Sequence, residues 1–104
     1  MNHQGKLGTL IVTGGSRGIG AAVATLASER GYFVAVNFST GEAEAKKVVD
    51  AIAAGGGHAI AVQADVSDEQ QIMRMFQTAE QQLGPIKALV TTRASRAVSR
   101  AWKK

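Results

Sequence analysis

The sequence has no cysteine among its 104 residues, which excludes disulfide bonds, thiolate nucleophiles and cysteine-ligated metals. Its two histidines, His3 and His58, are too few and too scattered for a metal site. No apolar run approaches the roughly 18 residues that a membrane-spanning helix needs, and the N-terminus lacks the apolar core of a secretory signal. We therefore expect a cytoplasmic protein without a metal or a membrane segment.

Positive charge is concentrated at the C-terminal end. The formal net charge is +4, but residues 1–92 carry seven basic and eight acidic residues, whereas residues 93–104 carry five basic residues and no acidic one. A nucleic-acid-binding domain would spread its basic residues over the folded part. The distribution argues against a nucleic-acid partner and favours a solvated end, with loose phosphate binding by that end as the alternative.

Short apolar runs alternate with stretches of helical periodicity. Strands are predicted at 10–12, 33–38, 59–62 and 88–90, and helices at 18–30, 41–54 and 67–83. The third helix has the spacing of a capping box at its start, Ser67 with Gln70. The predicted inward residues are Ile19, Val23, Leu26 and Ala27 in the first helix, Ala45, Val48, Val49 and Ile52 in the second, and Ile72, Phe76, Ala79 and Leu83 in the third, with Met73 and Met75 beside them.

This βαβαβαβ order predicts the α/β class, because strands that are apolar throughout are covered on both faces of a parallel sheet. Right-handed crossovers would give a partial Rossmann-like, doubly wound sheet with strand order 3-2-1-4, about four strands and three helices. We expect residues 1–90 to form this half-domain. Residues 91–104 are expected to be a basic, irregular tail.

The clearest chemistry lies in the glycines between the first strand and the first helix. Gly14, Gly18 and Gly20 have the spacing G-x-x-x-G-x-G. Glycine allows a sharp turn and lets phosphate oxygens approach main-chain N–H groups, and the helix N-terminus adds a partial positive charge. Ala21 and Ala22 stand where a P-loop has Lys and Ser or Thr. The loop therefore favours dinucleotide binding over nucleotide hydrolysis, with a plain tight turn as the alternative.

The stretch T-G-G-S-R-G-I-G at residues 13–20 resembles the cofactor motif of the short-chain dehydrogenase/reductase family. V-A-V-N-F-S at 34–39, D-V-S-D at 65–68 and L-G-P-I-K-A-L-V at 83–90 extend the resemblance over about residues 7–90. It implies an NAD(P)-dependent oxidoreductase that transfers hydride between nicotinamide and a carbonyl or alcohol carbon.

By position, the resemblance implies a set of cofactor-binding residues. Asp65 would accept a hydrogen bond from the adenine amino group, with Val66 beside the ring; the alternative is that Asp65 helps Ser67 to start a helix. The pyrophosphate and adenine ribose would be lined by Gly14, Ser16, Arg17, Gly18, Ile19 and Gly20. Asn37 and Ser39, at the end of the second strand, complete the set.

The end of the second strand also bears on the choice of cofactor. An NAD site has an acidic residue there that binds the ribose hydroxyls. Residues 37–40 contain no acid, and Glu42 is expected to face outward on the following helix. Arg17 is available to pair with a 2′-phosphate, with a solvated loop charge as the alternative. We therefore expect NADP(H) rather than NAD(H).

The resemblance stops after residue 90. Where the family has Asn-Asn-Ala-Gly, this sequence has T-T-R-A-S at 91–95, and the family's Ser and Tyr-x-x-x-Lys catalytic residues have no counterpart. Deleting one nucleotide from codons for Asn-Asn-Ala-Gly-Ile yields codons for Thr-Thr-Arg-Ala-Ser, so our hypothesis is a frameshift near residue 91. We expect an inactive N-terminal portion with no catalytic residue and marginal stability.

Three other expectations remain open. The chain could be a standalone dinucleotide-binding module, or an interaction protein that acts through its basic tail. An exposed fourth strand would also present an apolar sheet edge, through which the chain could associate with itself.

Overall fold

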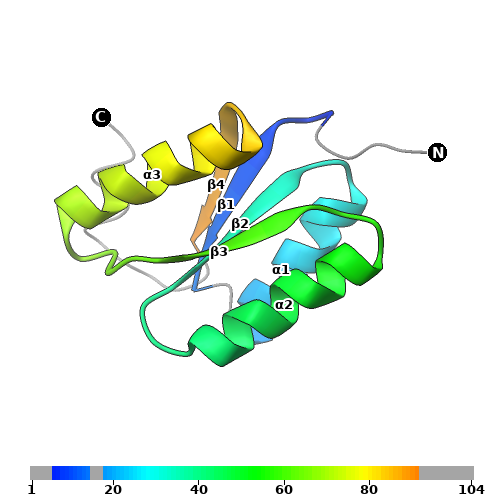
Figure 1. Ribbon diagram of the computed structural model, residues 1–104, viewed down its shortest axis with the longest axis horizontal. Helices are drawn as coiled ribbons and strands as arrows, with labels where there is room; N and C mark the ends of the chain where they lie inside the picture. The colour runs from blue at the N-terminus through cyan, green and yellow to red at the C-terminus, as the bar shows by residue number, and fades with distance from the viewer. Residues whose placement is uncertain (1–5, 15–17, 92–104) are drawn as a thin grey trace.

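The computed structural model describes residues 6–14 and 18–91 (Figure 1). Within these residues, four parallel strands form one sheet in the order β3-β2-β1-β4. The elements in chain order are β1 (Thr9–Thr13), α1 (Gly18–Glu29), β2 (Phe33–Phe38), α2 (Glu42–Ala54), β3 (Ala59–Gln63), α3 (Glu69–Leu83) and β4 (Ile86–Thr91). The predicted α/β class and strand order are confirmed.

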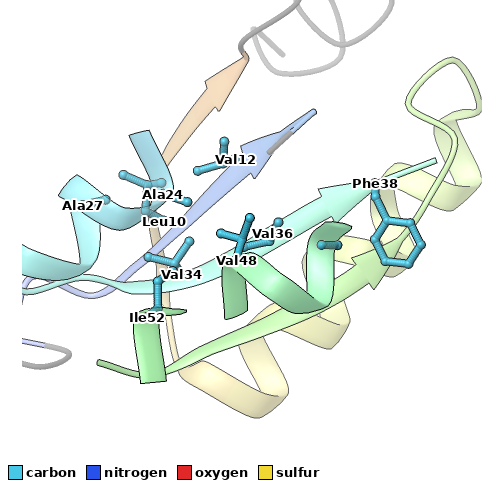
Figure 2. Packing of buried hydrophobic residues seen from close by; sticks show 10 residues of the cluster. Leu10, Val12, Ala24, Ala27, Val34, Val36, Phe38, Val48 and Ile52 are labelled. Carbon is cyan, nitrogen blue, oxygen red and sulfur yellow. The ribbon is translucent and has the colours of Figure 1, made fainter. Parts of the chain in front are cut away.

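Helices cover both faces of the sheet, with α1 and α2 on one face and α3 on the other (Figure 1). We call these the two-helix face and the one-helix face. Successive strand residues point to opposite faces, so Leu10 and Val12 of β1 pack under α1 and α2, whereas Ile11 packs under α3. Figure 2 shows Val34 and Val36 of β2 on the two-helix face with Val48 and Ile52 of α2.

Helix α1 packs on the sheet through small residues. Its buried positions are Gly20, Ala24 and Ala27, spaced four and three residues apart. The prediction that Ile19 and Leu26 face inward was wrong, since these side chains are 75% and 51% exposed. The helical period was read correctly, but the small residues allow the helix to lie close to the sheet and so occupy the inward stripe.

The other two helices follow their predicted stripes more closely. In α2, the buried residues are Ala45, Val48 and Ile52, as predicted. In α3 they are Ile72, Met75, Ala79 and Leu83, and Phe76 is half-buried against the same cluster. The expected packing of Met73 was wrong, because its side chain is 64% exposed.

Candidate cofactor-binding site

The carboxyl ends of parallel strands meet at one edge of the sheet, which is where open α/β sheets bind their ligands. In this chain, the segments that follow β1, β2 and β3 leave the sheet at that edge, and Gly14, Ser39 and Asp65 lie on them. The fold therefore brings together predicted site residues that are up to about fifty positions apart in the sequence.

The turn from β1 into α1 depends on glycine. Gly14 has φ of 67° and Gly18 has φ of 52°, both in the left-handed region that side chains other than glycine rarely adopt. A Cβ atom on Gly18 would meet nothing within 4 Å, so the requirement there is the backbone conformation. Gly20 is buried and serves the close packing of α1.

The N-terminus of α1 begins directly at this turn, and its first turn contains no acidic residue. The N–H groups of this first turn have no acceptor within the helix, and no carboxylate of the helix itself compensates the partial positive charge. Predicted contact residue Ile19 is exposed next to the turn. Ser16 and Arg17 lie outside the described residues.

The side chain of Asn37 links the ends of three strands from inside. It is 3% exposed. Its Oδ1 atom accepts a hydrogen bond from the Gly14 N–H at 3.4 Å, and its Nδ2 atom donates to the carbonyl oxygens of Val62 at 3.3 Å and Ala64 at 3.2 Å. The amide thus bonds to main-chain groups, which the prediction of a cofactor contact did not foresee.

Asp65 is exposed and forms a local turn with Ser67. Its Oδ1 atom accepts from the Ser67 hydroxyl at 2.7 Å and from the Ser67 N–H at 3.0 Å. Both bonds hold the pKa of Asp65 below its ordinary value, and the bond from the hydroxyl has the larger effect. Desolvation of the carboxyl acts in the opposite direction and is the smallest of the three effects. Within the described part of the chain, Oδ2 of Asp65 has no hydrogen-bond partner, so an ionised acceptor remains at this edge.

Asp68, rather than Ser67, caps α3. Its side chain accepts from the Gln70 N–H at 2.9 Å, so the predicted capping box of Ser67 with Gln70 was wrong. The Ser67 hydroxyl is engaged by Asp65 instead. Gln71 joins the two aspartates, since its Oε1 atom accepts from the Asp65 N–H at 2.8 Å and its Nε2 atom donates to Asp68 at 3.3 Å.

The end of β2 offers hydroxyl groups and no carboxylate. Ser39 is exposed, and its carbonyl oxygen accepts from Nε2 of Gln63 at 3.2 Å. The nearest acid along the chain, Glu42, has a side chain that is 67% exposed and lies 3.8 Å from the Lys46 ammonium on the same helix. The expectation that Glu42 faces outward is confirmed.

Other kinds of site find no support in the part of the chain that the structure describes. Its histidines and acidic residues form no group of three or more that could hold a metal ion. Searching the same residues finds no helix with the length and hydropathy to cross a membrane.

Comparison with known proteins identifies the family of this chain. Residues 8–100 match the family model described as short chain dehydrogenase. The chain belongs to the short-chain dehydrogenase family. This family uses an NAD(P) dinucleotide, and the edge described above is where the Rossmann-type folds bind one.

Relatives in the family are considerably longer than this chain. An uncharacterized oxidoreductase of Escherichia coli, YgfF, is 48% identical over 80 residues, which are 77% of this chain and 32% of the relative. Elsinochrome reductase 1 of Elsinoe fawcettii is 47% identical over 81 residues, which are 78% of this chain and 30% of the relative. The chain thus spans about a third of the length of these curated family members.

Solved structures of the family match the fold. A short-chain dehydrogenase/reductase from Serratia marcescens superposes with a TM-score of 0.81 at 30% identity, over 91% of this chain and 38% of that one. A dehydrogenase/reductase from Sinorhizobium meliloti gives 0.79 at 35% identity, over 88% and 35%. The described structure corresponds to a Rossmann-like half of a short-chain dehydrogenase.

Proposed function

We propose that this chain is the NADP(H)-binding N-terminal portion of a short-chain dehydrogenase, and that it binds the cofactor at the carboxyl edge of its sheet. The turn between β1 and α1 carries the proposal. It has two left-handed glycines, Gly14 directly after β1 and Gly18 as the first residue of α1, and the first turn of this helix has no carboxylate. A diphosphate fits such a turn, because its oxygens can approach the N–H groups closely and meet the positive helix end.

The adenine end of the cofactor would lie along the segment after β3. Asp65 would accept a hydrogen bond from the adenine amino group through Oδ2, while its Oδ1 stays with Ser67. Val66, which is half-buried, would pack beside the ring. The lowered pKa keeps the Asp65 carboxyl ionised, and thus an acceptor, at neutral pH.

The preference for NADP(H) rests on the end of β2. Residues 37–40 include no acid that would bind a ribose diol or repel a 2′-phosphate. Ser39 and Thr40 are both exposed there and offer hydroxyl donors. Arg17 supplies the cation in the proposal.

We further propose that the chain is catalytically inactive by itself. The bound nicotinamide supplies a hydride donor or acceptor, but the reaction also needs a general acid or base at the substrate oxygen. The only tyrosine, Tyr32, precedes β2 at the opposite end of the strand from the site and is half-buried against the two-helix core. A catalytic Tyr-x-x-x-Lys pair is absent from the sequence.

We propose that the departure from the family motif at residues 91–95 comes from a frameshift, as the nucleotide arithmetic suggests; the family model itself matches on to residue 100. Translating the downstream DNA in the neighbouring frame should reveal the family's Ser and Tyr-x-x-x-Lys. A downstream frame without these residues would contradict the frameshift and leave a standalone dinucleotide-binding module as the favoured interpretation.

The binding proposal is tested by titrating the 104-residue chain with NADP⁺ and NAD⁺ in a calorimeter. We expect saturable binding of both, tighter for NADP⁺. Gly18→Ala should weaken NADP⁺ binding at least about tenfold, equivalent to about 1.4 kcal/mol, because its Cβ would face the bound phosphates. Absence of saturable binding by the folded wild-type chain would overturn the proposal.

Gly84→Ala is the matched control for Gly18→Ala. Gly84 also has a positive φ, of 111°, and a Cβ there would also meet nothing within 4 Å. It caps the C-terminus of α3, at the other end of the sheet from the site. We expect this variant to lose stability but keep its affinity for NADP⁺. Equal losses of affinity in the two variants would mean that the Gly18 effect comes only from backbone strain.

A further inference from the structure

We propose that Asn37 is a positioning residue of the cofactor site. Its buried amide would hold the glycine turn after β1 and the adenine segment after β3 at a fixed separation, so that one dinucleotide can contact both. The inference rests on the proposed function, and it changes the predicted role of Asn37 from a cofactor contact to a brace between two contacting segments.

The hydrogen bonds of Asn37 reach the two segments at their first residues. Gly14, which donates to Oδ1, begins the glycine turn. Ala64, whose carbonyl oxygen accepts from Nδ2, immediately precedes Asp65. The bonded residues lie 23 and 27 positions from Asn37 in the sequence, so the brace joins parts of the chain that share no local turn.

The amide also continues the sheet beyond its last regular pairs. The register between β1 and β2 ends at Val12 with Val36, and that between β2 and β3 ends at Phe38 with Gln63. Asn37 accepts from Gly14, past the pairs of β1, and donates to Ala64, past the pairs of β3, in addition to Val62 within β3. The two segments are therefore fixed to the middle strand and, through it, to each other.

Only a side chain with both a donor and an acceptor can make these bonds. An ionised aspartate has acceptors only and would face the carbonyl oxygens of Val62 and Ala64. Leucine, which has a similar shape, could not replace these three hydrogen bonds, and the loss of the buried one to the Ala64 carbonyl is unfavourable. The burial of Asn37 thus makes the amide group itself the requirement.

A brace of this kind affects long ligands more than short ones. A dinucleotide engages the glycine turn and the adenine segment together, so its affinity depends on their separation. Adenosine has no phosphate and would engage the adenine segment alone, so its binding does not depend on the separation of the two segments. Loss of the brace should therefore weaken NADP⁺ binding more than adenosine binding.

The decisive variant is Asn37→Asp, measured from pH 8 to pH 5. At pH 8 the carboxylate lacks the donor, and we expect NADP⁺ to bind at least about tenfold more weakly than to wild type, with adenosine within about threefold of wild type. Burial and the facing carbonyls raise the pKa of this introduced carboxyl. Its protonated form regains an O–H donor, so at pH 5 the affinity of the variant for NADP⁺ should be within about threefold of that of wild type. Asp65, whose pKa lies below its ordinary value, stays ionised over this pH range in both proteins and does not contribute to the change.

Gln63→Glu is the matched control. The Gln63 amide also joins β3 to the β2 side, by donating to the carbonyl oxygen of Ser39, but it is exposed. We expect the same chemical change there to leave the affinity for both ligands close to that of wild type at every pH. Thermal unfolding at each pH establishes that the variants are folded. If Asn37→Asp unfolds at pH 8, Asn37→Ser supplies the comparison of the two ligands, because its smaller hydroxyl cannot reach both segments.

Equal losses for NADP⁺ and adenosine, or losses that do not change with pH, would overturn the positioning role. A ligand-free measurement separates this result from failure of the proposed function. In amide NMR spectra of Asn37→Asp, the resonances of Gly14 and Asp65 should change with the same apparent pKa, because the introduced carboxyl would be bonded to both segments. If these shifts occur while wild type binds no dinucleotide, only the proposed function fails; if the two resonances titrate independently, the positioning role fails.

Discussion

In the described part of the chain, two helices cover one face of the sheet and one helix covers the other. The half-buried side chains at the sheet edges differ in size between these two faces. On the two-helix face, the half-buried residues of the edge strands are mostly alanines: Ala59 and Ala61 of β3 and Ala88 of β4, beside Val90 of β4. On the one-helix face they are larger: Ile60, Val62, Ile86 and Leu89. The single helix α3 leaves these larger apolar side chains at the sheet edges only half-buried. The one-helix face is thus the less complete half of the core.

The largest expected difference between the two faces is in the stability lost when an isoleucine is replaced by alanine on each face. Ile52→Ala on α2 removes a side chain that is 3% exposed in the two-helix core, and we expect a loss of about 3 kcal/mol in the free energy of unfolding. Ile60→Ala on β3 removes a half-buried side chain from the one-helix face and should cost only about 1 kcal/mol. Urea denaturation of both variants measures the losses. Equal losses would mean that the two faces are equally well packed.

The second effect concerns association through β4. Within residues 6–14 and 18–91, β4 pairs only with β1. We expect the chain to associate reversibly through this strand, because an apolar edge strand presents unpaired main-chain groups to another chain. Leu89→Lys places a charge where the one-helix face meets the edge and should weaken association about tenfold in sedimentation velocity experiments. Lys87→Ala removes the charge that β4 already carries at an exposed position and should strengthen it. A wild-type chain that stays monomeric at high concentration would contradict the prediction.

The sequence predicted the fold better than it predicted which side chains face inward. Apolar runs and glycine stops located every strand and helix that the structure describes. The error at Ile19 and Leu26 arose because periodicity identifies a stripe of apolar residues but not whether the large or the small ones face the sheet. That choice depends on the distance between helix and sheet, which only the assembled core sets.

The site was predicted in part, for a related reason. Glycines at a strand-to-helix turn have a local meaning, so Gly14 and Gly18 could be identified from spacing. The roles of Asn37 and Gln71 depend on main-chain groups that only the folded sheet brings beside them. The D-V-S-D stretch did contain a signal, since either aspartate can cap a helix, but choosing Asp68 over Ser67 required the turn that Asp65 forms.

The smallest effects test the start of α3, which is the only helix on the one-helix face within the described residues. Asp68→Ala removes the N-cap and should cost about 1 kcal/mol at pH 7, because the Gln70 N–H loses its acceptor. Urea denaturation measures this loss. Ser67→Ala is the matched control, since the structure gives Ser67 no capping role, and it should cost less than Asp68→Ala. The reverse order would restore the capping box predicted from the sequence.

Ser67→Ala should instead change the titration of Asp65. It removes the hydroxyl bond that contributes most to lowering the pKa of Asp65, so that pKa should rise toward its ordinary value. A carboxyl whose pKa is lower in the folded than in the unfolded state stabilises the fold above its unfolded pKa of about 3.9, and this contribution is lost as the pH falls through the folded pKa. The stability of wild type should therefore decline more steeply with acid than that of Ser67→Ala. Carboxyl ¹³C shifts of Asp65 between pH 2 and pH 7 measure the pKa directly, and an unchanged value in the variant would mean that the hydroxyl does not stabilise the carboxylate.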